Sequence, residues 1–200
     1  MVTLTLITDR RRLGGRDLAD LVREAAEAGV DRVQVREKDL AGRGLRALVS
    51  EVLAATAGTA ARVLVNGRPD VAAAAGAHGV QLPEEGLPVS RVKRAFPDLV
   101  VGASRHTVDG ARRAEAEGAD FVLLGPIFAT PGKEARALGL GPLREAARSM
   151  GIPVHAVGGI GPDNARQVAE AGARGLAAIG AFLDAPASQV VRALRAAGPA

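Results

Sequence analysis

Short apolar runs alternate with longer amphipathic segments along the whole chain. The apolar runs are rich in Val, Ile and Leu and occupy residues 3–8, 31–36, 61–65, 78–82, 99–102, 119–124, 152–157 and 174–179. Segments between them have apolar residues at helical spacing, as in 17–28 and 163–171. Eight strand–helix units in strict alternation, without a linker rich in Pro, Gly or Ser, favour a closed (β/α)8 barrel over an open doubly wound sheet. Residues 1–200 are therefore predicted to form one α/β TIM-barrel domain.

An internal repeat supports the barrel. Each copy has the end of a helix, a Gly, a short turn and a strand, and the Gly suits a left-handed cap that reverses the chain. The copies are EAGVDRVQV (27–35), AAGAHGVQL (74–82), AEGADFVLL (116–124) and EAGARGLAA (170–178). Their unequal spacing disfavours a solenoid, which is the competing architecture.

Aligning the copies on this Gly predicts which strand residues face the interior. Strand periodicity puts the following positions on one face: Gln34, Gln81, Leu123, Ala177 and, two residues further on, Arg36, Pro83, Gly125 and Ile179. Two glutamines and an arginine are too polar for an outer surface that helices cover. We expect these positions in the barrel interior and at its upper mouth.

Charge and aromatic content argue against a nucleic-acid partner. Aromatic residues make up 2% of the chain and there is no Trp or Tyr, so base-stacking platforms are lacking. The 26 Lys and Arg residues are scattered among 22 acidic residues, which gives a net charge of only +4. This pattern does not predict a basic stripe.

Cysteine is absent and the three histidines have no paired spacing, so we expect no disulfide and no metal site. The N-terminal residues MVTLTLITD lack the basic-then-apolar layout of a signal peptide. No apolar run reaches transmembrane length. We therefore expect a soluble, cytoplasmic protein with no membrane partner. A homodimer is compatible with this composition.

Polar residues gather where the predicted strands end, which is where such barrels form their active sites. In QVREKD (34–39), Gln34, Arg36 and Lys38 alternate on one face of an extended segment. Two cations and an amide suit an anion such as phosphate or carboxylate. The alternative is a solvated charge cluster with Glu37 and Asp39. The position of Gln34 inside the strand favours the anion site.

A second candidate site is the Gly-Gly turn in AVGGIGPDN (156–164). Gly158 and Gly159 precede a helix that is expected to open at Pro162, and backbone N–H groups at a helix start suit a phosphate. The turn Ile179–Gly180 in AAIG follows the next strand, and barrels often bind phosphate at these two loops. A purely structural Gly-Gly turn is the alternative.

The stretch GPIFATPGKEA (125–135) opens a loop that is expected to reach about Gly141. Thr130 and Lys133 lie in it. The loop is long enough to act as a lid that carries Lys133 over an anion. A plain exposed connection is the alternative.

The stretch GASRHT (102–107) puts His106 at a strand-to-helix corner. Thr107 is the predicted N-cap of a helix that begins near Val108, which would fix this corner at the mouth. Histidine is the side chain suited to proton transfer near neutral pH. His106 is therefore the candidate acid/base group, with a solvated loop residue as the alternative. His78 and His155, at or inside strands, are expected to be structural.

These motifs occur in the same order in the thiamine phosphate synthase superfamily, which the chain resembles from LITD (6–9) to AAIG (177–180). The synthases join a pyrimidine pyrophosphate to a thiazole phosphate with Mg²⁺. Their third motif reads Asn-Asp and their fourth His-Leu-Gly-Gln-x-Asp, and the two acidic residues bind metal and pyrophosphate. Here those positions are Gly67 and Gly86, and the synthase Thr-x-Thr-Lys reads Thr130-Pro131-Gly132-Lys133. Glycine offers no side-chain oxygen to Mg²⁺, which prefers carboxylates.

At the positions where it departs from the synthases, the chain resembles a sister family, the thiazole tautomerases of thiamine biosynthesis. The shared motifs are Asn66-Gly67-Arg68, Val80-Gln81-Leu82-Pro83 and Ser104-Arg105-His106. This resemblance implies a cofactor-independent isomerase that aromatises a carboxythiazole phosphate bearing an exocyclic double bond. It implies that His106 moves the protons and that Asn66, Gln81 and Ser104 help to bind substrate. Synthase activity and a non-catalytic sensor of thiazole or thiamine phosphates are the alternatives.

Overall fold

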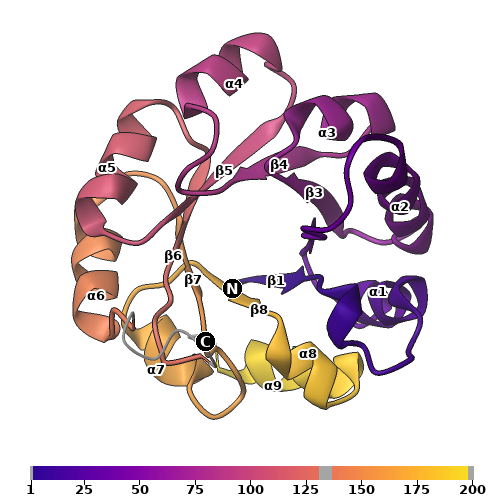
Figure 1. Cartoon of the computed structure of the whole chain (residues 1–200). Helices are drawn as coiled ribbons and strands as arrows, with labels where there is room; N and C mark the ends of the chain where they lie inside the picture. The colour runs from indigo at the N-terminus through magenta and orange to yellow at the C-terminus, as the bar shows by residue number, and fades with distance from the viewer. Residues whose placement is uncertain (1, 131–136, 198–200) are drawn as a thin grey trace.

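Eight parallel strands close into a barrel in which each strand pairs with its neighbours in chain order and β8 pairs with β1 (Figure 1). The computed structural model describes residues 2–130 and 137–197. The strands are β1 (Thr3–Ile7), β2 (Arg32–Val35), β3 (Arg62–Asn66), β4 (Gly79–Leu82), β5 (Val100–Arg105), β6 (Phe121–Leu124), β7 (Val154–Val157) and β8 (Gly175–Ala178). The predicted (β/α)8 barrel is confirmed.

Helices alternate with the strands and form a ring outside the barrel (Figure 1). A short 3-10 helix, η1 (Arg10–Arg12), follows β1. The α-helices are α1 (Leu18–Glu27), α2 (Gly42–Ala55), α3 (Pro69–Ala75), α4 (Val89–Ala95), α5 (Val108–Ala116), α6 (Leu140–Ser149), α7 (Ala165–Glu170), α8 (Gly180–Asp184) and α9 (Ala187–Ala196).

Alternation along each strand divides the core into two layers, as β3 illustrates. Val63 and Val65 are 0% exposed and belong to the large apolar core between strands and helices. On the opposite face of the strand, Leu64 lines a cavity in the barrel. Asn66, two residues further along that face, accepts a hydrogen bond from Gln34. Because successive side chains of a strand point to opposite faces, strands buried on both sides read as nearly continuous apolar runs.

The repeated glycines act as predicted. Gly29, Gly76, Gly118 and Gly172 have φ angles of 98°, 72°, 94° and 97°. This left-handed conformation is strained for residues with a side chain, and it reverses the chain from each helix directly into the next strand.

Two predicted boundaries are wrong. Strand β5 continues to Arg105 instead of ending at 102, because residues 102–105 pair in register with β6. Helix α7 begins at Ala165 instead of Pro162. Asn164 explains the second difference: its Oδ1 accepts from Gly161 N at 3.0 Å and its Nδ2 donates to Gly159 O at 2.7 Å, which holds a turn before the helix.

Aromatic and cationic groups fill the amino end of the barrel. Arg32 Cζ lies 4.2 Å from the centre of the Phe121 ring, and the Phe121 and His155 rings are 4.9 Å apart. His155 is only 1% exposed. A Cβ on Gly175 would come within 2.5 Å of His155 Cγ, so glycine is needed there. Burial, together with the charge of Arg32, lowers the pKa of His155 to about 3.

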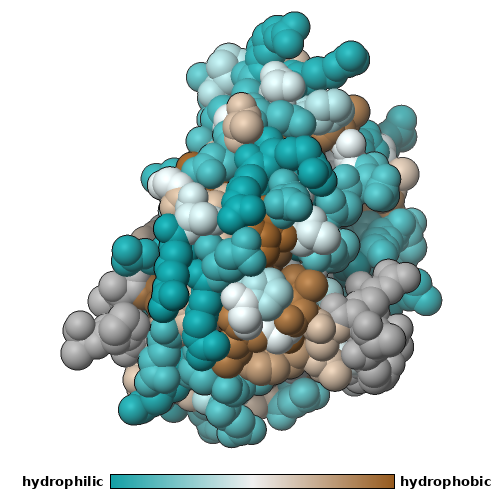
Figure 2. Space-filling model, turned by 90° about the vertical axis from the view of Figure 1, so that its left-hand side faces the viewer, coloured by the Kyte–Doolittle hydropathy of each residue, from teal (hydrophilic) through white to brown (hydrophobic). Residues whose placement is uncertain are grey.

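The outer faces of the helices are mostly polar. Figure 2 shows the side that carries α5 and α6, where hydrophilic residues predominate. Arg112 joins these helices by donating to Glu145 Oε1 at 3.0 Å. Among the described residues, Leu87 is the large hydrophobic residue that is exposed to solvent, with 52% of its surface accessible. Among the described helices, none is both long and apolar enough to cross a membrane.

Burial of His155 predicts a loss of stability in acid. Its pKa is about 3 in the folded protein against an ordinary value of 6.5, so between these values the unfolded chain binds a proton that the folded protein does not. The free energy of unfolding should therefore fall as the pH drops below about 6.5, by up to about 1.4 kcal/mol per pH unit. Urea denaturation at a series of pH values measures this slope. His155→Gln should flatten it, and parallel slopes in both proteins would contradict the assignment.

Candidate active site

Four polar side chains cross the interior from β2 to β5. Gln34 Nε2 donates to Asn66 Oδ1 at 3.0 Å, and Gln81 Nε2 donates to Ser104 Oγ at 2.9 Å. Asn66 and Gln81 are register partners on adjacent strands, so the two pairs are neighbours. Gln34 and Gln81 are 4% and 2% exposed, and an amide without a partner at this depth would be costly. The structure thus brings together four of the predicted substrate-binding residues.

The other side of the interior is apolar. Ile7, Leu123 and Ala177 form a buried cluster, with Val157 and Ile179 packed against it. These residues lie on or directly after β1, β6, β7 and β8. The interior therefore has a polar half and an apolar half, and the predicted inward positions of the two glutamines, Leu123 and Ala177 are confirmed.

His106 directly follows β5 at the carboxyl end of the barrel and is exposed. Thr107 Oγ1 accepts from Gly110 N at 3.0 Å, so Thr107 is the N-cap of α5 as predicted. The backbone N–H of His106 donates to Glu84 Oε2 at 2.8 Å, and its ring Nδ1 makes a hydrogen bond with the carbonyl oxygen of Gly125. Contacts from two neighbouring loops thus fix this residue.

The contact with Gly125 determines which nitrogen of His106 can act as a base. A carbonyl oxygen only accepts hydrogen bonds, so Nδ1 carries the proton. In the neutral ring, Nε2 then has the free lone pair. Gly125 itself is held in place by close packing, because a Cβ there would come within 2.1 Å of Val157 O.

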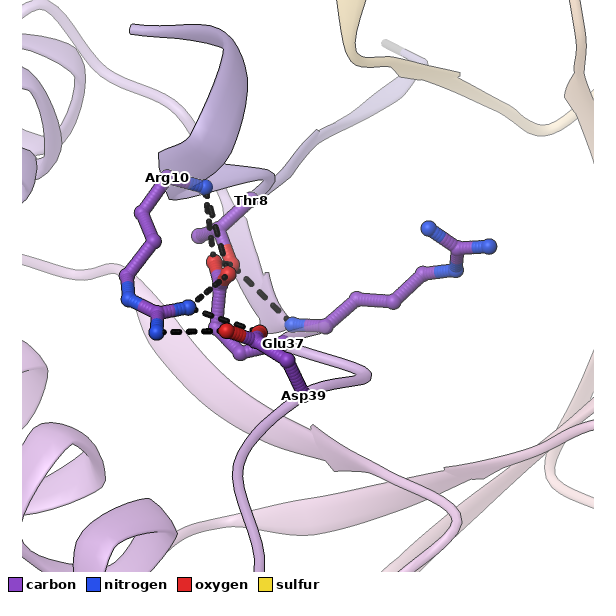
Figure 3. Close-up of polar contacts among 5 residues, drawn as sticks. Thr8, Arg10, Glu37 and Asp39 are labelled. Carbon is purple, nitrogen blue, oxygen red and sulfur yellow. Dashed lines mark hydrogen bonds and ion pairs between the residues drawn. The ribbon is translucent and has the colours of Figure 1, made fainter.

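A buried carboxylate ties the end of β2 to the start of η1 (Figure 3). Glu37 is 6% exposed and accepts from Thr8 Oγ1 at 2.6 Å and from Arg10 N at 3.1 and 3.2 Å. The Arg10 guanidinium also donates to both oxygens of Asp39, at 2.7 Å each. Thr8 Oγ1 accepts in turn from Arg36 N at 3.0 Å. We call Thr8, Arg10, Glu37 and Asp39 the Glu37 cluster.

The Glu37 cluster shows which charged residues of QVREKD (34–39) form ion pairs. The interpretation as a solvated cluster is wrong for Glu37, which is buried and faces Arg10. The hydrogen bond from Arg10 also lowers the pKa of Asp39 to about 2, because the cation stabilises the charged carboxylate. Among the ion pairs of the described residues, none involves Arg36 or Lys38. Both remain available to an anion.

The Gly-Gly turn after β7 has a structural cause. Gly158 and Gly159 have φ angles of 94° and 64°. A Cβ on Gly158 would come within 2.4 Å of Pro126 Cβ, and one on Gly159 within 2.8 Å of Phe128 Cβ. Close packing against the segment after β6 therefore accounts for both glycines. The turn at Ile179–Gly180 follows β8, which pairs with β7, so the two predicted phosphate contacts lie on neighbouring strands.

Part of the predicted lid lies outside the described residues. Thr130 is half-buried and is the last residue before the gap. Lys133 lies within 131–136, which the structure does not describe. Beyond it, α6 begins at Leu140, so Gly141 is already helical. The lid role of Lys133 stays a prediction.

Comparison with known proteins places the chain in a family. Residues 4–182 match the family described as thiamine monophosphate synthase. The chain belongs to this family. A relative from Aquifex aeolicus (strain VF5), named putative thiamine-phosphate synthase 2, is 43% identical over 182 residues, covering 90% of this chain and 97% of the relative. The thiamine-phosphate synthase of Roseiflexus castenholzii (strain DSM 13941 / HLO8) is 40% identical over 184 residues, covering 90% and 81%.

Solved structures agree with this family. The thiamine phosphate pyrophosphorylase from Pyrococcus furiosus superposes with a TM-score of 0.89 at 38% identity, covering 98% of this chain and 95% of that protein. A 3-hexulose-6-phosphate synthase gives a TM-score of 0.72 at 22% identity, covering 99% of this chain and 100% of the other, and shows the shared fold alone.

The residues present do not fit the Mg²⁺ site that the resemblance to the synthases implies. Gly67 and Gly86 occupy the two positions where it implies acidic residues, and a Cβ on Gly86 would come within 2.9 Å of Pro83 atoms. Glu84, close by in the chain, is hydrogen-bonded to His106 N. Within the described residues, no three His, Asp or Glu side chains gather as a metal site.

Replacing Glu37 by Gln should destabilise the protein. Oε1 accepts from Thr8 Oγ1 and Oε2 accepts from the Arg10 guanidinium, so the amide nitrogen of Gln would face a donor at one of these two positions. We expect the free energy of unfolding in urea to fall by about 1.5–3 kcal/mol, the range for hydrogen bonds to a charged group. Asp39→Asn, at the exposed end of the same cluster, is the matched control and should change stability little. Equal effects of the two variants would contradict the central role of Glu37.

Proposed function

We propose that the protein is a thiazole tautomerase, a cofactor-independent isomerase that aromatises a carboxythiazole phosphate in thiamine biosynthesis. The observation that carries this proposal is the His106 ring, whose Nδ1 contacts the Gly125 carbonyl and whose Nε2 is therefore the proton-accepting nitrogen. The reaction needs one group that takes up and returns a proton, which is the usual work of histidine. Membership of the family supports a phosphorylated small molecule as substrate.

The two halves of the interior suit such a substrate. The thiazole ring would lie against the apolar half, near Ile7 and Leu123. Its two anionic ends need separate donors, because like charges repel. We assign the carboxylate to the side of Arg36 and the phosphate to the backbone of Gly158, Gly159 and the Ile179–Gly180 turn, in keeping with phosphate sites of other barrels.

The neutral amides and hydroxyl would orient the ring without adding charge. Gln34 donates to the Asn66 oxygen, which leaves the Asn66 Nδ2 hydrogens as donors. Gln81 donates to Ser104 Oγ, which leaves the hydroxyl hydrogen of Ser104 as a donor. Both pairs are part of the interior, so they are held in place before substrate arrives.

The proposed proton transfer is balanced and returns the enzyme to its starting state. Nε2 of neutral His106 takes the proton from ring carbon C2, and the electron pair of that C–H bond moves into the ring. The exocyclic double bond shifts into the ring, and the exocyclic carbon takes a proton back from Nε2–H. The Gly125 carbonyl accepts from Nδ1–H throughout and favours the positively charged ring between the two steps.

The names of the relatives favour a second candidate, the synthase reaction. Relatives at 40–43% identity carry that name, and the Pyrococcus furiosus protein is named a thiamine phosphate pyrophosphorylase. Gly67 and Gly86 weigh against it, since neither offers an oxygen for Mg²⁺. We rank it second. A sensor that binds the same phosphates without turnover ranks third.

One pair of assays separates the three candidates. Purified protein is incubated with the dihydrothiazole carboxylate phosphate while the thiazole chromophore is followed, and in parallel with pyrimidine pyrophosphate and thiazole phosphate, with and without Mg²⁺. We expect turnover in the first assay and none in the second. His106→Asn should lower turnover by about 10²–10⁴ and leave the melting temperature and phosphate binding nearly unchanged, because His106 is exposed.

The matched control is Asp109→Asn, an exposed residue in the first turn of the same helix, which should keep full turnover. A His106 variant that keeps more than about a tenth of the activity would remove the histidine from the mechanism. Robust Mg²⁺-dependent formation of thiamine phosphate would establish the synthase. Binding of the first substrate without conversion would establish the sensor.

A further inference from the structure

A cavity of about 110 Å³ lies at the amino end of the barrel, opposite the mouth. Arg32, Arg62, His78 and Val100 line it at or beside the first residues of four adjacent strands, β2 to β5, and Leu64 lines it from two residues further along β3. A water molecule takes up about 30 Å³, so the cavity has room for one compact ion of several heavy atoms. The mouth residues described above lie at the carboxyl ends of the strands, so this is a separate place.

Two arginines stand side by side in this cavity. Arg32 and Arg62 are register partners on β2 and β3. Like charges directly opposite each other in a sheet lower stability. Among the described residues, neither guanidinium takes part in an ion pair with a carboxylate. The charges of Asp31 and Asp120 act on Arg32 from nearby, but these carboxylates form their ion pairs with Arg195 and Lys93.

The inner arginine packs against two neutral rings. Arg32 lies over the Phe121 ring at 4.2 Å, and its Nη1 is 3.5 Å from His155 Nδ1. Burial lowers the pKa of Arg32; the charge of Asp31 opposes this shift, and the charge of Arg62 adds to it. An anion between the two guanidinium groups would offset their mutual repulsion and supply a counter-charge to Arg32.

The histidine that lines the cavity is a hydrogen-bond donor. Val63 N donates to His78 Nδ1 at 3.1 Å, so Nδ1 is an acceptor and carries no proton. In the neutral ring the proton is then on Nε2. Every polar side chain that lines the cavity is thus a donor, while Leu64 and Val100 form apolar walls. Apolar walls strengthen the attraction between ions because they lower the local dielectric constant.

We infer that the cavity formed by Arg32, Arg62 and His78 is a binding site for a compact oxyanion of the size and charge of inorganic phosphate. Guanidinium groups match the oxygens of such an ion in geometry, and the imidazole N–H adds a third donor. The site does not depend on the proposed reaction at the mouth. The competing account is that Arg32 only closes the end of the barrel by packing on Phe121, which predicts no saturable response to anions.

The three histidines allow a direct test by NMR, because each reports on a different place. His78 lines the cavity, His106 stands at the mouth and His155 is buried. The ring Cε1–H signals are followed while inorganic phosphate replaces sodium chloride at constant ionic strength. The signal that disappears in His106→Asn belongs to His106. Of the other two, the His155 signal is the one whose position does not change when the pH is varied near neutrality, because the pKa of His155 is about 3. We expect a saturable shift of the His78 signal that persists in His106→Asn.

Arginine variants test which groups hold the ion. Arg62→Gln should raise the dissociation constant for phosphate about tenfold or more, as expected for the loss of one charge-assisted hydrogen bond. The constant is measured from the shift of the His78 signal. Arg113→Gln, an exposed residue on α5, is the matched control for the change in charge and should bind as the wild type does. Arg32→Lys keeps the charge but loses the forked geometry, and should also weaken binding. A His78 signal that phosphate leaves unmoved, or that chloride moves equally, would overturn the site, as would equal affinities of the Arg62 and Arg113 variants.

Discussion

Closure of the parallel sheet is the constraint on which both ends of this molecule depend. A closed barrel turns every second side chain of its eight strands into one narrow interior. A buried polar group there must find a partner inside the barrel. Gln34 donates a hydrogen bond to Asn66 and Gln81 donates one to Ser104. These bonds stabilise the interior and hold the amides at fixed positions. The fold itself therefore holds these polar groups in place.

Strand β2 shows how one alternating segment serves both ends of the barrel. Arg32, Gln34 and Arg36 share its inner face, with Arg32 at the amino end and Arg36 just beyond the carboxyl end. The end near Arg36 is fixed by the Glu37 cluster, since Thr8 Oγ1 accepts from the Arg36 N–H. A cation at each end and a paired amide between them follow from a period of two residues.

Glycines let neighbouring strands approach at both ends of the barrel. A Cβ on Gly102 would come within 2.2 Å of Phe121 Cζ near the amino end, and one on Gly125 within 2.1 Å of Val157 O just after β6. Because Gly125 has no side chain, it packs closely on β7, and its carbonyl reaches His106 Nδ1. The tautomer of the histidine thus depends on backbone packing on the neighbouring strands.

Local periodicity was enough to predict the barrel, its inward face and the cap at Thr107, because each depends on residues close together in the chain. The Glu37 cluster could not be predicted in this way, because Arg10 and Glu37 are 27 positions apart and meet only when β1 and β2 pair. The start of α7 was missed because Asn164 bonds back to Gly159 and Gly161, which favours a turn over a helix. The surroundings of His155 likewise depend on Arg32, 123 positions away.

The central claim is that the closed interior presents Nε2 of His106 to a ring held against the apolar half of the barrel. A crystal structure with the aromatic carboxythiazole phosphate bound tests this most directly. The account predicts the ring beside Ile7 and Leu123, the phosphate at the Gly158–Gly159 and Ile179–Gly180 turns, and Nε2 within about 3.5 Å of the carbon that receives the proton. A ligand bound at the mouth with Nε2 directed away from the ring, or with its phosphate at Arg36 and the glycine turns empty, would contradict it.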